Sequence, residues 1–171
     1  MPSTFDRVAD HPDSVENLLR AFGDEQYWRA WLTAEYGTDA TLDSIRIGPD
    51  GSVDVACTFT LRHDRLPGVV TRVYKSDLEI KRWESWSALT DGKATCTITA
   101  SMPGTPVKLS GSADLIPHPV DSTGAQLRVG GTVDVRIPMV GSKIEKVIAN
   151  QLMDLATTRR HFTDEWISRN Q

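Results

Sequence analysis

The feature that most restricts the fold is one long amphipathic segment near the end of the chain, residues 142–169. Its apolar side chains recur at the spacing of one helical face, and they are Ile144, Val147, Ile148, Leu152, Leu155, Phe162 and Trp166. Ser142 and Glu145 resemble a capping box at its start. At ~1.5 Å per residue this helix is about 42 Å long, longer than any single strand expected here. We therefore expect it to cross a sheet diagonally or to overhang it.

The segment before that helix, residues 40–137, alternates between apolar and polar side chains. A period of two predicts strands with one buried and one solvent-facing side. Turn sequences such as Pro-Asp-Gly at 49–51 and Asp-Gly at 91–92 separate the runs. The predicted strands are 40–47, 53–62, 78–89, 94–102, 107–115 and 127–137. Between the second and third of them, 3–4 spacing of apolar residues over 66–74 favours a short helix, whereas its three valines favour a strand.

The first 37 residues predict a strand followed by two short helices. Asp13 with Glu16 resembles a capping box for the first helix. Gly23 and Gly37 suit the left-handed conformation in which helices commonly end. The predicted elements are a strand at 4–9 and helices at 14–22 and 25–36.

This order of elements predicts an α+β fold in one domain, residues 1–171. A single antiparallel sheet with one apolar face needs a cover, and the long helix carries the only long apolar stripe. One helix is narrower than a seven-stranded sheet, so we expect space between the two. Small residues on the inner face of the sheet would enlarge this space. The small residues expected there are Ala100, Gly111, Ala113 and Gly131.

Composition and charge disfavour several classes of function. The formal net charge is −4, whereas a nucleic-acid binder would normally carry a basic excess. The start of the chain has no signal-peptide pattern, and the longest uncharged stretch, 94–107, is too short and polar to span a membrane. We expect a soluble, cytoplasmic protein that binds no nucleic acid and has no membrane span, with Cys57 and Cys96 as small buried side chains.

No motif for phosphate, metal or nucleophilic chemistry is present. The sequence lacks GxGxxG, GxxxxGK[ST], GxSxG and HExxH. The four histidines are scattered, so we expect no metal, no cofactor and no assigned catalytic residue. His161 lies at the edge of the helical stripe, either on the surface or facing the cavity as a hydrogen bonder or general base. The run Arg159-Arg160-His161 is interpreted as a solvated helix face.

The strand at 78–89 contains an anomaly. Arg82 and Glu84 share the face of Ile80 and Trp86 by parity, and an inward charge pair is costly unless its members meet or reach water. A bulge near Arg82 would reverse the parity and turn Trp83 inward. Alternatively, Arg82 or Glu84 holds the head group of a ligand in a polar pocket.

The whole chain resembles the helix-grip fold of the START-like superfamily. The resemblance lies in the element order and in His11-Pro-Asp-Ser-Val15, which opens the two short helices. Three further segments resemble an actinobacterial group of unknown function, namely Glu84-Ser-Trp86, Pro106-Val-Lys-Leu-Ser-Gly111 and the run from Ile137 to Glu145. The resemblance implies a curved seven-stranded antiparallel sheet around the C-terminal helix, with a cavity between them. That group contributes no catalytic residues.

The first of three hypotheses for function is a binder or carrier of an apolar small molecule, lipid or polyketide-like. The others are an interaction module with a filled core and a cyclase- or dehydratase-type enzyme that acts in the cavity. Catalysis is left uncertain and is not favoured, and neither the ligand nor the oligomeric state follows from the sequence. The residues predicted to line the ligand cavity are Ile80, Arg82, Glu84, Trp86, Ile98, Val129, Gly131, Val133, Val135, Ile148, Leu152 and Leu155.

Overall fold

The structure is a computed structural model that describes residues 2–171. Its strands are β1 (Ser3–His11), β2 (Ala40–Ile47), β3 (Val53–Leu61), β4 (Leu78–Trp86), β5 (Ala94–Ser101), β6 (Val107–Pro117) and β7 (Ala125–Val135). Its α-helices are α1 (Val15–Phe22), α2 (Glu25–Tyr36), α3 (Gly68–Thr71) and α4 (Gly141–Arg169). The predicted element order is thus confirmed, with strand ends shifted by up to three residues.

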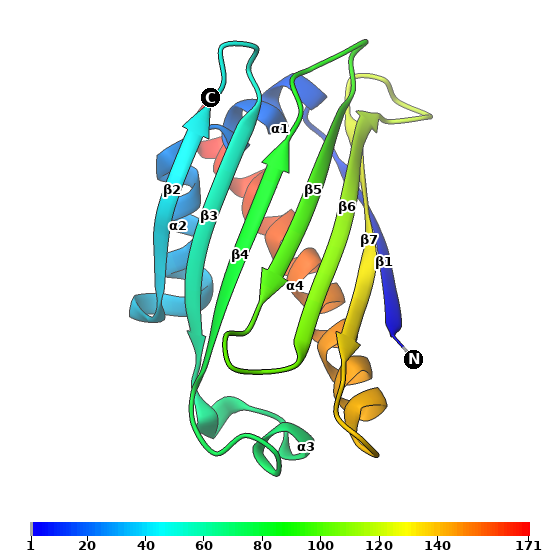
Figure 1. Ribbon diagram of the computed structural model, residues 1–171. Coiled ribbons are helices and arrows are strands. Elements are labelled where there is room, and N and C mark those ends of the chain that lie inside the picture. The colour runs from blue at the N-terminus through cyan, green and yellow to red at the C-terminus, as the bar shows by residue number, and fades with distance from the viewer. Residues whose placement is uncertain (1) are drawn as a thin grey trace.

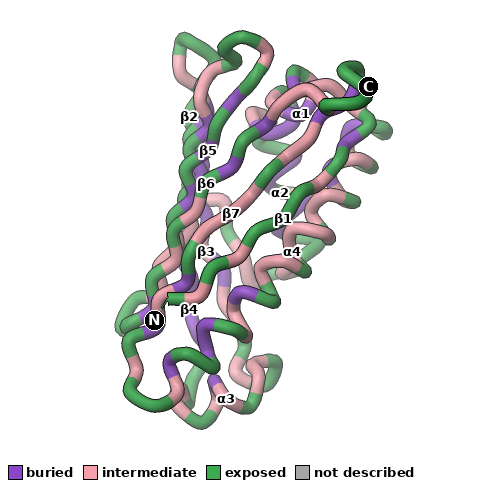
Figure 2. The backbone as a smooth tube through the Cα atoms, turned by 90° about the vertical axis from the view of Figure 1, so that its right-hand side faces the viewer, coloured by how far each residue is buried: buried purple, intermediate pink, exposed green. Residues whose placement is uncertain are grey.

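The seven strands form one antiparallel sheet in the order β1-β7-β6-β5-β4-β3-β2. Figure 1 shows α4 crossing behind this sheet, with α2 behind β2 and α1 behind the upper ends of the central strands. Seen from the side in Figure 2, the helices all lie on the same side of the sheet. The α+β helix-grip prediction is confirmed, because the long helix covers the single apolar face of a curved sheet.

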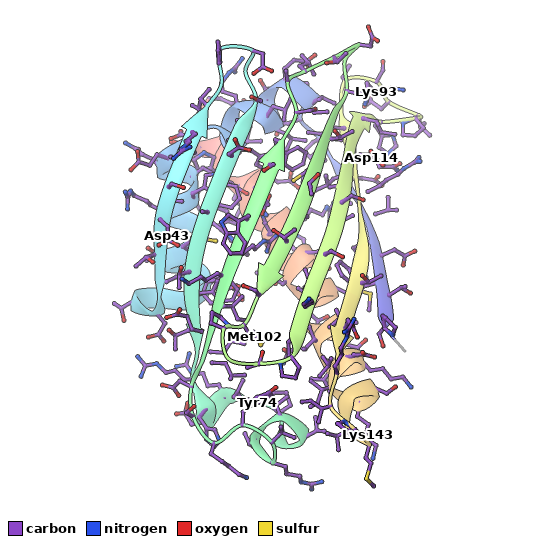
Figure 3. All side chains as sticks on the ribbon, in the orientation of Figure 1. Asp43, Tyr74, Lys93, Met102, Asp114 and Lys143 are labelled. Atoms are coloured by element: carbon purple, nitrogen blue, oxygen red, sulfur yellow. The ribbon has the colours of Figure 1, made fainter. Side chains whose placement is uncertain are left out.

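The opposite face of the sheet carries polar side chains. Figure 3 looks onto this outer face, where Asp43 on β2 and Asp114 on β6 are exposed. Each strand therefore separates an apolar inner row from a polar outer row, as a period of two requires. Within the described residues, no helix is both long and apolar enough to cross a membrane.

The two short helices begin and end differently from the prediction. Ser14, rather than Asp13, is the N-cap of α1, and its hydroxyl accepts a hydrogen bond from the Asn17 amide at 3.2 Å. Gly23 ends α1 at a φ of −89°, so the prediction of a left-handed conformation at this glycine is wrong. Gly37 ends α2 at a φ of 59°, where glycine is favoured.

The start of α4 also corrects the prediction. Val140 is the N-cap, and no side chain caps the helix, so Ser142 and Glu145 form no capping box. The Glu145 side chain is instead buried against the sheet. It accepts hydrogen bonds from the Val135 amide at 2.8 Å and from the Ser3 hydroxyl at 3.4 Å. This carboxylate ties the first turns of α4 to the end of β7 and the beginning of β1.

The ambiguous segment at 66–74 contains a helix, α3, of only four residues. A 3₁₀ turn at His63–Arg65 precedes it. Figure 3 shows Tyr74 and Met102 at this lower end of the molecule. Apolar side chains of α3 and its neighbours pack with Ile144 at the start of α4.

The buried side chains form two separate clusters. The first joins α1 and α2 to the sheet and to Ile167 near the end of α4. The second joins α3, β6, β7 and the first turns of α4. No residue of α4 between Ala149 and Thr163 is fully buried. The middle of α4 therefore lies over a part of the sheet that its side chains do not fill.

Candidate functional site

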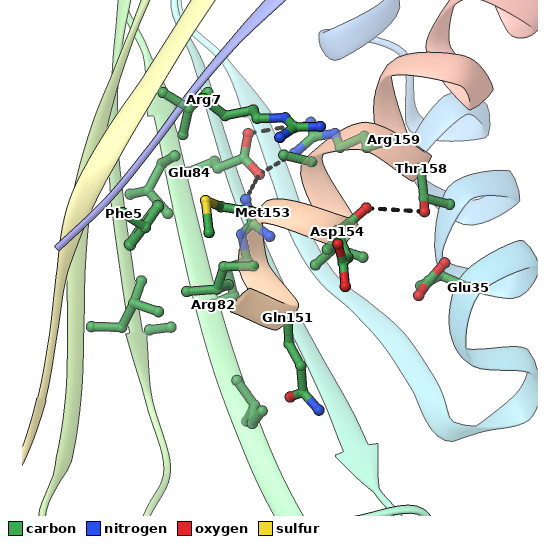
Figure 4. A pocket seen from close by; sticks show the side chains of 18 of the residues that line it. Phe5, Arg7, Glu35, Arg82, Glu84, Gln151, Met153, Asp154, Thr158 and Arg159 are labelled. Atoms are coloured by element: carbon green, nitrogen blue, oxygen red, sulfur yellow. Dashed lines mark hydrogen bonds and ion pairs between the residues drawn. The ribbon is translucent and has the colours of Figure 1, made fainter. Parts of the chain in front are cut away.

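A cavity of about 430 Å³ lies between the inner face of the sheet and the middle of α4 (Figure 4). That volume falls in the range of ~300–1,000 Å³ typical of small-molecule pockets. Its wall is mostly apolar, with side chains from six strands and from α1, α2 and α4. The apolar side chains include Phe5, Phe22, Phe59, Leu61, Ile80, Trp86, Ile98, Leu109, Leu127, Val129, Ile148, Leu152 and Leu155.

Nine of the twelve residues predicted to line the cavity do line it: Ile80, Arg82, Glu84, Trp86, Ile98, Val129, Ile148, Leu152 and Leu155. Val133 and Val135 are instead buried in the second cluster, with Ile144. Gly131 leaves no space, because a Cβ built there would lie 2.8 Å from the Phe5 ring. Phe5 occupies the volume that the sequence suggested was open.

The charged pair of β4 points inward without a bulge. The pairing of β3 with β4 runs without a shift from Val53 and Trp86 to Leu61 and Leu78. Trp83 faces outward and is 43% exposed. The bulge alternative is therefore wrong, and the parity of the strand places Arg82 and Glu84 at the cavity.

Glu84 is the centre of a buried charged cluster, defined here as Arg82, Glu84 and Arg159. Figure 4 shows the Glu84 carboxylate beside both guanidinium groups. Its Oε2 lies 2.9 Å from Arg82 Nη2 and 2.7 Å from Arg159 Nη1. Its Oε1 accepts from Arg159 Nη2 at 3.3 Å and from Trp86 Nε1 at 3.2 Å. Only 3% of the Glu84 side chain is exposed, so these four donors replace water completely.

The charges in this cluster stabilise one another. Burial alone would raise the pKa of Glu84, but the Arg159 and Arg82 charges outweigh it and lower that pKa from 4.5 to about 2. Burial likewise opposes the charge of Arg159, and the Glu84 carboxylate outweighs that effect and raises the pKa of Arg159. Glu84 and Arg159 are therefore both ionised at neutral pH.

Arg159 is the member of the cluster that the sequence interpretation missed. It was assigned to a solvated helix face, but its side chain is only 15% exposed. Its guanidinium lies 4.5 Å from the Trp28 ring centroid and 5.4 Å from that of Phe22, and its Nε donates to Tyr27 at 3.2 Å. The spacing contained the signal, because position 159 falls seven residues after Leu152 and thus on the apolar stripe.

A second polar pair joins His11, a buried residue of the cavity wall, to Asp164 on α4. His11 Nδ1 lies 2.6 Å from Asp164 Oδ1, and the His11 side chain is 2% exposed. Its Nε2 is buried without a hydrogen-bond partner. His161, the histidine singled out from the sequence, is exposed and does not line the cavity. Alternation from Phe5 through Ala9 to His11 would have placed His11 inward.

Neither cysteine contributes an ionised thiol to the site. Cys57 and Cys96 are free and buried, and burial raises the pKa of Cys57 to about 11. Among residues 2–171, no group of three or more His, Cys, Asp or Glu side chains is arranged to hold a metal ion.

Comparison with known proteins shows the family to which the chain belongs. A family model described as "Protein of unknown function (DUF2505)" matches residues 7–167. An uncharacterized protein of Mycobacterium tuberculosis is 40% identical, and the alignment covers 99% of both chains. The predicted resemblance to an actinobacterial group of unknown function is confirmed.

Solved structures with very different sequences share the fold. A START superfamily protein from Mycobacterium smegmatis is 10% identical with a TM-score of 0.51, over 98% of this chain and 99% of that one. The Zhui aromatase/cyclase from Streptomyces is 8% identical with a TM-score of 0.59, over 99% of this chain and 95% of that one. At such identities the likeness establishes the helix-grip fold and leaves the function to be argued from the cavity.

Proposed function

The chain belongs to the DUF2505 family of proteins of unknown function, and we propose that it binds or carries an apolar small molecule in the cavity between sheet and α4. The cavity of about 430 Å³ with its mostly apolar wall is the observation that carries this proposal. An unfilled apolar cavity costs stability through lost packing contacts. A lipid or polyketide-like molecule would restore those contacts.

The helix-grip fold supports this function without specifying it. One protein with this fold is an aromatase/cyclase, so the fold is compatible with a site for a small molecule. The alternative of an interaction module rests on a filled core, and the cavity argues against it. An enzymatic alternative would use His11, the one histidine among the described residues that lines this cavity.

Thermal unfolding with candidate ligands tests the proposal. A ligand that binds only the folded state raises Tm by mass action. We expect saturating fatty acids, sterols or polyketide-like aromatics to include at least one compound that raises Tm by several degrees. Native mass spectrometry of protein purified from its own host should show the corresponding added mass. The proposal would be contradicted if no compound shifted Tm and the purified protein carried none.

A matched pair of variants locates the binding. Ala100 lines the cavity, so Ala100→Leu should place added atoms in the ligand's space and reduce the ligand-induced shift in Tm. Ala56 alternates with the buried Val55 and Cys57 of β3 and so belongs to the outer row. Ala56→Leu makes the same chemical change there and should leave the shift unaltered. Equal shifts in both variants would place the ligand elsewhere.

A further inference from the structure

The charged cluster has one positive charge more than its single carboxylate can balance. Arg82 and Arg159 are two cations, and Glu84 is the only anion that contacts them. Two other acids line the cavity, Glu35 and Asp154, but both are exposed to solvent. The surplus charge thus belongs to the buried part of the cavity, where an unpaired ion is costly.

Glu84 and Arg159 have no capacity left for a ligand. Each oxygen of Glu84 already has two partners: Oε1 accepts from Arg159 Nη2 and Trp86 Nε1, and Oε2 accepts from Arg159 Nη1 and forms an ion pair with Arg82 Nη2. Arg159 donates from both terminal nitrogens to Glu84 and from Nε to Tyr27, which in turn contacts Thr163 at 2.8 Å. Their interactions hold α4 to the sheet, and they position the third member of the cluster.

Arg82 is the member with unused donors. It contacts Glu84 through Nη2 alone, and its Nε is buried without a hydrogen-bond partner. A guanidinium has five N–H donors in a planar fork that matches a carboxylate. Arg7 and Arg160 also line the cavity, and they donate to Thr157 at 2.7 Å and to the Asp10 carbonyl at 2.8 Å. Neither has a buried nitrogen without a hydrogen-bond partner, so Arg82 differs from both.

We propose that the ligand of this cavity is an amphipathic carboxylic acid whose carboxylate pairs with Arg82 while its apolar body fills the remaining volume. This inference rests on the proposed function and specifies the chemistry of its ligand. The carboxylate supplies both the missing negative charge and the missing acceptor for Arg82. The surrounding apolar wall makes the ion pair and the hydrogen bond between this carboxylate and Arg82 stronger than they would be in water.

Three probes with the same ten-carbon chain test the head group: decanoic acid, 1-decanol and decylamine. Isothermal titration calorimetry at neutral pH compares their Kd values, since the acid is then ionised. A charge-assisted hydrogen bond to a buried guanidinium predicts that the acid binds at least about tenfold more tightly than the alcohol. The amine should bind more weakly than the alcohol, because it adds a like charge.

Variants assign the preference to Arg82. Arg82→Gln should abolish the preference for acid over alcohol and leave the affinity for the alcohol within about twofold. Arg82→Lys keeps the charge without the planar fork and should retain only part of the preference. Arg46→Gln removes an exposed arginine of β2 and should keep the full preference. Circular dichroism establishes that each variant is folded.

The outcomes separate this inference from the function on which it rests. Equal binding of acid and alcohol to the wild-type protein would overturn the assignment of the head group and leave the cavity as an apolar site. Tighter binding of the amine would also overturn it. Failure of all three probes to bind, while another compound still raises Tm, would overturn this inference alone. Failure of the probes together with no Tm shift from any compound and no ligand in the purified protein would contradict both proposals. Loss of the preference in Arg46→Gln would show that the acid responds to surface charge, and it too would overturn the inference.

Discussion

At the scale of single residues, Glu84 is the side chain on which the polar part of the core depends. Its side chain is 3% exposed, and its carboxylate is the shared counter-ion of the Arg82 and Arg159 guanidinium groups. Removing one partner of a buried ion pair is far more destabilising than the net contribution of the pair, because the remaining charge stays buried. The free energy of unfolding should therefore respond strongly to a change at this one position.

We expect Glu84→Gln to lower the free energy of unfolding by about 3–5 kcal/mol. The amide keeps the size of the side chain and removes only its charge, so Arg82 and Arg159 lose their counter-ion. Urea denaturation at neutral pH measures the change. Glu79→Gln is the matched control, since Glu79 lies on the same strand and is exposed. A loss below about 1 kcal/mol in Glu84→Gln would show that the cluster is not coupled in this way.

Predictions for single residues were correct where side chains alternate between the two faces of a strand. Alternation along β4 correctly placed Ile80, Glu84 and Trp86 inward. It could not show that Glu84 meets Arg159, because that partner is 75 positions away and only the packing of α4 brings them together. Gly131 was misjudged for a related reason. The side chain above it belongs to Phe5 on a neighbouring strand, and no local pattern reports such a neighbour.

At the scale of elements, α4 is attached to the sheet by polar links as well as by apolar packing. Glu145 joins its first turns to β7, and Arg159 joins its later turns to β4. The sequence predicted the length and apolar face of this helix from periodicity. It assigned Glu145 to a cap, because a Ser-x-x-Glu pattern has the same form whether the carboxylate folds back locally or reaches a strand.

We expect Glu145→Ala to lower the free energy of unfolding by about 1–3 kcal/mol, because the buried Val135 amide loses its acceptor. Chemical denaturation provides the measurement. Lys146→Ala, at the adjacent exposed position of the same helix, should change stability by less than ~0.5 kcal/mol. Equal effects of the two changes would contradict the role assigned to the buried carboxylate.

At the scale of the whole molecule, the buried carboxylate makes stability depend on pH. The pKa of Glu84 is about 2 in the folded state and has an ordinary value of 4.5. Since the pKa of Glu84 is lower in the folded state, its ionised carboxylate contributes fully to the free energy of unfolding at pH values above the ordinary pKa. This contribution is lost as pH falls from there towards the folded-state value.

The comparison of wild-type protein with Glu84→Gln isolates this contribution. Their difference in free energy of unfolding should be constant from pH 7 to about 5.5 and should shrink steadily below pH ~4.5. Urea titrations at several pH values measure it, and the carboxylates common to both proteins cancel. A difference that remained constant down to pH 3 would contradict the depressed pKa.

The overall architecture followed from the order of elements, since one apolar sheet face and one apolar helix stripe have few ways to cover each other. The same reasoning predicted a space between them. The identity of its polar lining depended on side chains from β1, β4 and α4, which are separated in sequence and meet only in the folded molecule.

The two packed clusters at either end of α4 have a mechanical consequence. The helix is held to the sheet near Ile144 and near Ile167, while no residue between Ala149 and Thr163 is fully buried. Gentle curvature of a long helix needs only small changes in its hydrogen bonds. Arg159 also ties α4 to Glu84 on β4, so bending of the turns from Ala149 to Ala156 can alter the height of the cavity while the contacts on either side of those turns are kept. Occupants of unequal thickness can then be accommodated by the curvature of one helix, with no rearrangement of the strands.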